Sequence, residues 1–279
     1  MILGIKKHLL PVGMLLLVTV ATSGTLNTAQ AANARADILQ AADTVKSGEY
    51  VDRRFYKQIN KPFITNDKRK KMLIIGDSHA KDFYNAVSEN NLDQRYQIST
   101  RRIPAICGVY LGPENISGFI EKRHVPNCQK SDTLADAMPQ IKQADVVILA
   151  ANWKLWSAQR LPTTIQNLQI KEPQKLLIVG RKNFGKLNLR KYLRLSENEL
   201  RQLRNPVYGL QREIDQTMQQ TLPEGMFVNT QALICKSEKD CPLFTPQTKL
   251  ISFDGGHLTQ YGARYVGSVL LQNPPLNQL

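Results

Sequence analysis

The stretch MLIIGDSHAKDFYNAV, residues 72–87, joins four apolar residues to a Gly-Asp-Ser-His turn and a polar run with helical spacing. An unbroken apolar run of this length is typical of a strand buried on both faces of a parallel sheet. Gly76, Asp77 and Ser78 favour a turn that leads into a helix, because Asp and Ser are common at helix N-termini. The stretch therefore predicts a buried strand, a turn, and a helix over residues 80–90 with Ser78 at its N-terminus.

Three further apolar runs repeat this pattern: VVILA (146–150), KLLIVG (175–180) and MFVNT (226–230). Helical spacing is found at residues 134–143, 157–169, 196–221 with an interruption at Pro206, and 258–271. Ser196 and Glu199 have the spacing of a capping box. Alternating strands and helices predict an α/β fold, a three-layer α/β/α sandwich around a central, mostly parallel sheet. Binding sites in such folds lie at the carboxyl ends of the strands.

The N-terminal residues 1–31 are predicted to be a secretory signal peptide. Lys6 and Lys7 precede an apolar run and then small residues, with cleavage expected after Ala31 or Ala34. The apolar run is short for a membrane span, and no later segment is long enough to cross a bilayer. Residues 32–70 are predicted to form a helical lead-in and residues 71–279 one α/β domain. We therefore expect an exported protein, periplasmic or extracellular.

Export changes the interpretation of the four cysteines, because thiols outside the cytoplasm tend to be oxidised and an even number favours disulfides. Three pairings are possible. We predict local pairing, Cys107 with Cys128 and Cys235 with Cys241. A metal site is not expected, since the spacing of Cys235 and Cys241, without a nearby histidine, matches no common zinc pattern.

The formal net charge is +14, which falls by two when Lys6 and Lys7 leave with the signal peptide. Such a surface favours anionic partners: acidic polysaccharide, lipopolysaccharide phosphate, a membrane face or nucleic acid. Export argues against nucleic acid. The basic residues are scattered with few aromatic residues between them, which favours a solvated basic face over a dedicated binding groove.

A serine nucleophile needs a base, and the sequence after residue 34 offers three histidines. His79 follows Ser78 directly, and adjacent helical residues point about 100° apart, so His79 is poorly placed as the base and is expected to shape the wall of the site. His124 lies in the charged segment EKRHVPNC, where a solvated histidine is expected. His257 is the remaining candidate.

His257 lies in DGGHLTQYGA, residues 254–263. Two glycines let Asp254 reach the imidazole Nδ1–H, hold the tautomer and stabilise the imidazolium. The backbone N–H of Ser78, at a helix N-terminus, suits an oxyanion, and Asn152, just after an apolar run, could supply a second donor. The alternative is structural: a helix cap at Ser78, a turn at Asn152 and ordinary loop residues at Asp254 and His257.

Taken together, GDSHA (76–80), LAANW (149–153) and DGGHLTQYGA resemble the SGNH (GDSL-like) hydrolase superfamily. The likeness is greater to one branch, the SGNH domain associated with acyltransferase-3 family polysaccharide O-acetyltransferases. That branch also tends to carry a short cysteine-bracketed segment, here CKSEKDCPLF (235–244). The resemblance runs from about residue 71 to residue 271 and implies a flavodoxin-like SGNH sandwich, with Ser78 as nucleophile, His257 as base and Asp254 as its orienter.

The same resemblance implies three oxyanion donors, Ser78, Asn152 and Gly108. Two residues depart from the family's G-x-N-D block: Ala150 stands at the position of its glycine and Trp153 at that of its aspartate. No segment of the chain resembles the acyltransferase-3 module. The resemblance therefore implies action alone or with a separate membrane acyltransferase that supplies acyl groups.

The sequence thus predicts an exported serine enzyme that acts on acyl esters of an envelope or surface glycan. It would be an O-acetyltransferase or O-acetylesterase with an acyl-serine intermediate and no cofactor. The two activities share that intermediate and differ in the acceptor that reaches it. The alternative is a non-catalytic glycan-binding or assembly protein that retains the fold. A lipase is disfavoured because no extended apolar lid is found, and the sequence predicts no oligomeric state.

Overall fold

The computed structural model describes residue 1 and residues 35–206, 209–237 and 239–279. The predicted signal peptide, apart from Met1, lies outside the described residues, as do its cleavage sites. Residues 35–42 are helical. None of the described helices is both long and apolar enough to span a bilayer.

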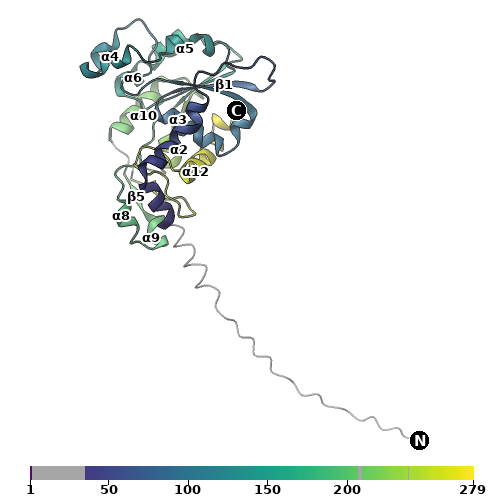
Figure 1. Cartoon of the computed structure of the whole chain (residues 1–279), viewed down its shortest axis with the longest axis vertical. Helices are drawn as coiled ribbons and strands as arrows, with labels where there is room; N and C mark the ends of the chain where they lie inside the picture. Colours follow the sequence, from purple (N-terminus) through teal and green to yellow (C-terminus); the bar gives the residue numbers. More distant parts are fainter. Residues whose placement is uncertain (2–34, 207–208, 238) are drawn as a thin grey trace.

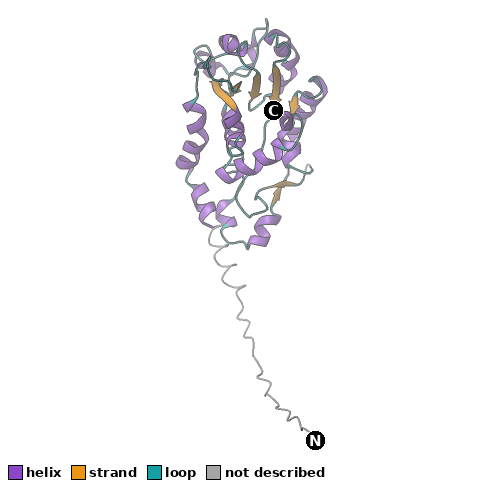
Figure 2. Cartoon of the chain, turned by 90° about the vertical axis from the view of Figure 1, so that its right-hand side faces the viewer, coloured by secondary structure: helices purple, strands orange, loops and turns teal. Residues whose placement is uncertain are grey.

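The centre of the protein is a five-stranded parallel sheet in the order β2-β1-β3-β4-β6. Figure 2 shows strands in orange among the surrounding helices. Its strands are β1 (Lys70–Gly76), β2 (Tyr96–Arg102), β3 (Val146–Ala150), β4 (Lys175–Val179) and β6 (Phe227–Val228). A separate antiparallel pair joins β5 (Arg204–Asn205) to β7 (Cys241–Pro242). The chain passes from β1 to β2 on one side of β1, and then to β3 on the other side, so the strand order reverses at β1. Open α/β sheets bind ligands in the crevice outside the carboxyl ends of the strands at such a reversal.

Helices cover both faces of the sheet (Figure 1). The longer ones are α2 (Thr44–Lys57), α3 (Ser78–Ser88), α5 (Leu134–Ile141), α7 (Leu161–Leu168), α10 (Gly209–Thr221) and α12 (Gln260–Leu271). The shorter ones are α4 (Val125–Cys128), α6 (Leu155–Gln159), α8 (Leu189–Tyr192), α9 (Glu197–Gln202) and α11 (Thr230–Ile234). Single 3₁₀ turns are η1 (Leu92–Arg95), η2 (Ile116–Phe119), η3 (Lys122–His124) and η4 (Leu276–Gln278).

Strand β1 shows why two helical layers form. Met72 and Ile74 pack with α3 and α12, whereas Leu73 and Ile75 pack with α5, α7 and α10 on the opposite face. All four side chains are fully buried. A strand with apolar side chains on both faces needs a cover on each, so the predicted three-layer α/β/α sandwich with a parallel sheet is confirmed.

Strand β2 was not predicted, because its sequence YQISTRR is polar. It is an edge strand whose polar side chains bond to the backbone of the segment before β1. Ser99 Oγ donates to Lys61 O at 2.7 Å, and Thr100 Oγ1 donates to Phe55 O at 2.7 Å. Buried polar groups with partners can replace apolar ones, so this strand lacks the apolar run that marks the others.

Several boundaries differ from those predicted. The helix expected over residues 157–169 begins earlier and divides into α6 and α7, with a proline in the first turn of α7. The segment 196–221 contains α9, with the Ser196–Glu199 capping box, then β5 and, after Pro206, α10. The last helix begins at Gln260 because the Thr259 side chain caps it by accepting from Gly262 N.

Helix α2 packs on α3 and belongs to the same fold. Val51 and Phe55 are buried. Asn85 of α3 donates to Val51 O at 3.1 Å, and the guanidinium of Arg54 donates to Asn85 Oδ1 at 3.1 Å. The described part of the predicted lead-in therefore rests against the helix that begins at Ser78.

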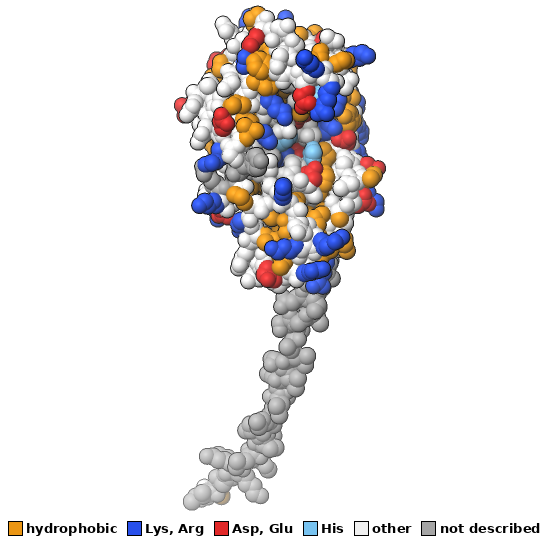
Figure 3. Space-filling model, turned by 90° about the vertical axis from the view of Figure 1, so that its left-hand side faces the viewer, with side chains coloured by type: hydrophobic (Ala, Val, Ile, Leu, Met, Phe, Trp, Pro, Cys, Tyr) orange, Lys and Arg blue, Asp and Glu red, His pale blue; other side chains and the backbone are white. Residues whose placement is uncertain are grey.

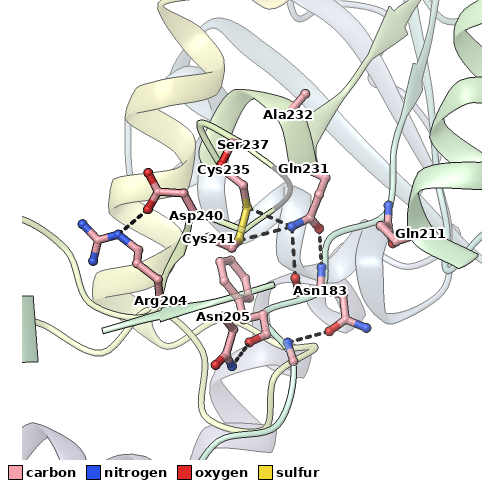
Figure 4. The surroundings of a disulfide bond; sticks show 12 residues. Asn183, Arg204, Asn205, Gln211, Gln231, Ala232, Cys235, Ser237, Asp240 and Cys241 are labelled. Atoms are coloured by element: carbon pink, nitrogen blue, oxygen red, sulfur yellow. Dashed lines mark hydrogen bonds and ion pairs between the residues drawn. A yellow bond between two sulfur atoms is a disulfide. The ribbon is translucent and has the colours of Figure 1, made fainter. Parts of the chain in front are cut away.

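Both expected disulfides are present, Cys107–Cys128 and Cys235–Cys241. The second joins the end of α11 to β7 (Figure 4). Beside it, Gln231 Nε2 donates to Asn183 O at 3.0 Å, and Gln231 Oε1 accepts from Asn183 N at 2.7 Å. The disulfide region thereby supports the segment that follows β4.

Candidate active site

Ser78 is placed by a close approach between β1 and β3. Gly76 ends β1 with φ of 149°, and a side chain there would put its Cβ 1.8 Å from Ala150 O. The chain then enters α3 through Asp77, whose Oδ1 accepts from His79 N at 2.8 Å. Ser78 is the first residue of α3 and half-buried. Its hydroxyl makes no hydrogen bond with any described residue and is not enclosed, so solvent reaches it.

Asp77 also connects this turn to the next strand. Its Oδ2 accepts from Asn152 N at 2.7 Å, so one carboxylate holds both the start of α3 and the residue that follows β3. Burial raises the pKa of Asp77, and the backbone donors His79 and Asn152 oppose that rise. From the sequence Asp77 was only a turn residue; its position directly after a buried strand was the available signal.

Asn152 presents its amide in an orientation suited to donation. Its Oδ1 is buried and has no hydrogen-bond partner among the described residues, whereas its Nδ2 is not enclosed. The amide nitrogen is therefore unpaired within the described part of the chain, and an unpaired amide can donate to an oxyanion.

Asp254 and His257 lie in direct contact. His257 Nδ1 is 2.6 Å from Asp254 Oδ2, and Asp254 Oδ1 accepts from the backbone N–H of His257 and of Gly256 at 2.7 and 2.8 Å. Gly255 allows this turn with φ of 92°, and a Cβ there would lie 2.1 Å from Gly185 O. The ring of Phe253 stacks on the imidazole with centroids 5.8 Å apart.

This geometry sets the charge of both groups. The hydrogen bond that His257 donates to Asp254 raises the pKa of His257 above its ordinary value of 6.5, against burial, which lowers it. Burial alone would raise the pKa of Asp254, but hydrogen bonds from His257 and Gly256 hold it at about 2. Asp254 is therefore a carboxylate that holds Nδ1–H, and Nε2 of His257 remains as the basic atom.

The His257 loop is fastened to α3 by Asp82, one turn after Ser78. Asp82 Oδ1 accepts from Leu258 N at 3.2 Å, and Lys182 Nζ donates to Asp82 Oδ2 at 2.6 Å and to Gly256 O at 2.9 Å. The loop that carries His257 thus lies against the first two turns of the Ser78 helix. No hydrogen bond joins Ser78 to His257 within the described part of the chain. Asp82 and Lys182 were not predicted from the sequence; the available signal was a lysine just past the strand over 175–180 and an acid four residues after Ser78.

The other two histidines take different places. His79 is half-buried and lines a small cavity with Asp82 and Lys182. Burial, followed by the nearby charges of Lys182 and Arg181, lowers its pKa well below 6.5, so it is neutral. His124 lies 4.0 Å from Glu121 in the loop between the first two cysteines. Figure 3 shows histidine side chains at the surface in the middle of one face, beside an acidic side chain.

A family model described as the SGNH domain fused to AT3 domains matches residues 47–272. The chain belongs to this SGNH family. Its fold is similar to the periplasmic domain of the lipopolysaccharide acetyltransferase of Salmonella ser. Paratyphi A, with a TM-score of 0.56 and 17% identity over 85% of this chain and 98% of that one. The search of curated proteins gave no match.

The two departures from the SGNH family's G-x-N-D block have a structural account. Trp153 Nε1 donates to Val179 O at 2.8 Å, and the indole is buried. It therefore ties the end of β3 to β4. Ala150 on β3 carries the carbonyl that Gly76 on β1 approaches closely. The glycine that allows the two strands to approach is therefore Gly76, and position 150 can hold an alanine.

Gly108 lies on the connection after β2, at the same end of the sheet. Its φ is 74°, and a Cβ there would lie 2.5 Å from the ring of Trp156, on the helix that begins shortly after Asn152. Its backbone N–H has no partner among the described residues. Gly108 is thus packed against the helix that follows the Asn152 segment.

Among the described residues, no group of three or more His, Cys, Asp and Glu side chains is arranged to hold a metal ion. The chemical groups at the site are a hydroxyl, an imidazole with its carboxylate, and amide donors. Together these suit attack on an ester carbonyl.

Proposed function

We propose that this protein is an exported serine enzyme that transfers or hydrolyses acetyl esters of a bacterial envelope or surface glycan. The observation that carries the proposal is the contact of 2.6 Å between Asp254 and His257 Nδ1, on a loop bonded to the helix that begins at Ser78. A base held in this tautomer, on a loop bonded to a helix that begins with a serine, supports an arrangement that activates a hydroxyl.

In the proposed reaction, Ser78 Oγ attacks the acetyl carbonyl while His257 Nε2 takes the hydroxyl proton. The negative oxygen of the tetrahedral intermediate accepts from the backbone N–H of Ser78, the Asn152 amide and the backbone N–H of Gly108. His257 then gives its proton to the departing oxygen, which leaves an acetyl-serine. Water or a sugar hydroxyl then gives its proton to His257 and attacks that ester; His257 returns the proton to Ser78 Oγ as the ester bond breaks, and acetate or the acetylated sugar leaves.

Transfer is the favoured outcome. The family takes its description from SGNH domains fused to AT3 domains, and the protein of similar fold is named as a lipopolysaccharide acetyltransferase. We propose that the acceptor is an envelope polysaccharide and that a separate membrane acyltransferase supplies the acyl groups. The net charge, +14 for the full chain and +12 without Lys6 and Lys7, is compatible with an acidic acceptor.

The test uses the mature protein with 4-nitrophenyl acetate and a fluorophosphonate probe. Wild type is expected to release nitrophenol and to be labelled at Ser78. Ser78→Ala should abolish both signals, and His257→Ala should lower kcat/KM by about 10³-fold or more. His124→Ala is the matched control and should retain wild-type activity. Analysis of products with an added oligosaccharide acceptor then separates acetyl transfer from hydrolysis.

The second candidate is a non-catalytic glycan-binding or assembly protein. It is favoured by one observation, that Ser78 makes no hydrogen bond with His257 within the described residues. Catalytic hydrogen bonds are often long in the absence of substrate, so this observation does not outweigh the Asp254–His257 contact. A folded wild type that neither turns over the ester nor reacts with the probe would reject the enzyme and favour this candidate.

A further inference from the structure

Asp82 and Lys182 form an ion pair that is shielded from water. The side chain of Asp82 is 0% exposed and that of Lys182 is 5% exposed, with Nζ and Oδ2 2.6 Å apart. The two residues lie 100 positions apart in the chain. No step of the proposed reaction uses either of them.

The pair joins three segments that must be aligned for the reaction. Asp82 is on α3, four residues after Ser78, and Lys182 follows β4. Both then bond to the backbone of the His257 loop, Lys182 to Gly256 O at 2.9 Å and Asp82 to Leu258 N at 3.2 Å. These two backbone atoms belong to the residues immediately before and after His257.

Stability is a weak reason for such an arrangement. Desolvation of two charges is costly, and replacing a buried ion pair with well-packed apolar side chains of similar volume often leaves stability unchanged or raises it. What the charges provide here is direction: besides the bond between them, the carboxylate and the ammonium group each bond to the backbone of the same loop. We propose that Asp82 and Lys182 are a positioning pair that fixes the His257 loop against the Ser78 helix.

This inference rests on the proposed function, because positioning matters only if His257 acts on Ser78. It also has a consequence independent of turnover. Asp82 faces His257 from α3 and Lys182 faces it from the segment after β4; the other charged or titratable groups near it are Asp254, Asp77 and His79. The Asp82 carboxylate favours the imidazolium, so its removal should lower the pKa of His257.

The experiment compares wild type, Asp82→Asn, and the double variant Asp82→Asn with Lys182→Met. The double variant removes both charges at once, so that no unpaired buried charge is left, and the new amide keeps an oxygen for Leu258 N–H. The matched control is Asp132→Asn with Arg101→Met, which removes another largely buried ion pair, with atoms 2.5 Å apart, that does not contact the His257 loop. The measurements are thermal unfolding, NMR titration of His257, amide hydrogen exchange of residues 256–258, and kcat/KM for 4-nitrophenyl acetate.

We expect Asp82→Asn to lower the pKa of His257. The double variant should remain folded, exchange the Leu258 amide faster and lose at least about tenfold in kcat/KM, because small misplacements of catalytic groups are costly. The control should change thermal stability alone. The inference is overturned if the pKa of His257 and the exchange of Leu258 in the variants equal those of wild type. An inactive wild type would reject the proposed function. The NMR titration of His257 and the amide exchange of Leu258 would still show whether Asp82 and Lys182 position the His257 loop.

Discussion

At the scale of single residues, the pKa of His257 determines how activity depends on pH. The base must be neutral, and Asp254 raises the pKa of His257 above 6.5. The acid limb of the kcat/KM profile for 4-nitrophenyl acetate is therefore expected to have its midpoint above pH 6.5, with activity lost as the pH falls through it. Asp254→Asn should move that midpoint to lower pH and reduce the plateau by about 10³–10⁴-fold.

The control for that profile is Asp43→Asn. Asp43 is a partly exposed cap of α2, and its pKa is lowered by the backbone N–H of Lys46. Its removal should leave the midpoint unchanged. If Asp254→Asn also kept the wild-type midpoint and plateau, Asp254 would not be the partner of His257 in solution.

Gly76 gives a second prediction at this scale. A methyl group there would meet the Ala150 carbonyl at 1.8 Å, and the φ of 149° is unfavourable for any side chain. Gly76→Ala should therefore lower the free energy of unfolding by about 2–5 kcal/mol. Gly118 supplies the control in Gly118→Ala, because a Cβ added there would meet nothing within 4 Å. Urea unfolding curves measure both, and equal midpoints would show that β1 and β3 can separate.

The site also shows which contacts a sequence can indicate. Asp254 and His257 are three residues apart across two glycines, so their contact could be inferred locally. Asp82 and Lys182 are 100 residues apart, and only the packing of α3 against the end of β4 brings them together. Local spacing can mark each of the two as a candidate, but it cannot show that they pair with each other.

At the scale of elements, α2 is the helix whose attachment can be tested most directly. Phe55 is 0% exposed and packs in the core between α2 and the sheet, whereas Val45 on the same helix is 69% exposed. Phe55→Ala should cost about 3–5 kcal/mol of unfolding free energy. Val45→Ala should change it by less than about 0.5 kcal/mol. If Phe55→Ala changed the free energy of unfolding as little as Val45→Ala does, α2 would not be part of the cooperative fold.

Element prediction succeeded where burial is apolar and failed where it is polar. The apolar runs at β1, β3 and β4 were predicted close to their observed bounds. Strand β2 was missed because its buried Gln97, Ser99 and Thr100 are satisfied by backbone atoms from a segment far away in the chain. A pattern of hydrophobicity contains no trace of those partners.

At the scale of the whole molecule, the strand order explains why the candidate residues can meet. The pairing aligns Gly76 with Ala150 and Ala150 with Val179. Counting two residues on from each of these three aligned positions gives Ser78, Asn152 and Arg181. All three therefore lie at the carboxyl edge of the sheet. The parallel sandwich was predicted, but the order of its strands was not, because long-range pairing is not encoded in any one segment.

The two disulfides give the last prediction, on global stability. Cys107 and Cys128 are 21 residues apart, and Cys235 and Cys241 are 6 apart. A longer closed loop restricts the unfolded chain more, so on this chain-entropy model Cys107→Ala with Cys128→Ala should cost about 3 kcal/mol and Cys235→Ala with Cys241→Ala about 2 kcal/mol. Guanidinium unfolding under oxidising conditions measures each pair.

Unfolding of the wild type in the presence of dithiothreitol provides the comparison, since reduction opens both loops and should lower stability by more than either double variant. The opposite ranking of the two variants would have a specific structural meaning. The Cys235–Cys241 bridge lies against Gln231, which holds both the N–H and the carbonyl of Asn183, next to Lys182. A larger loss at the shorter loop would therefore show that this bridge stabilises the folded segment after β4, and with it the support of the His257 loop, beyond its effect on the unfolded chain.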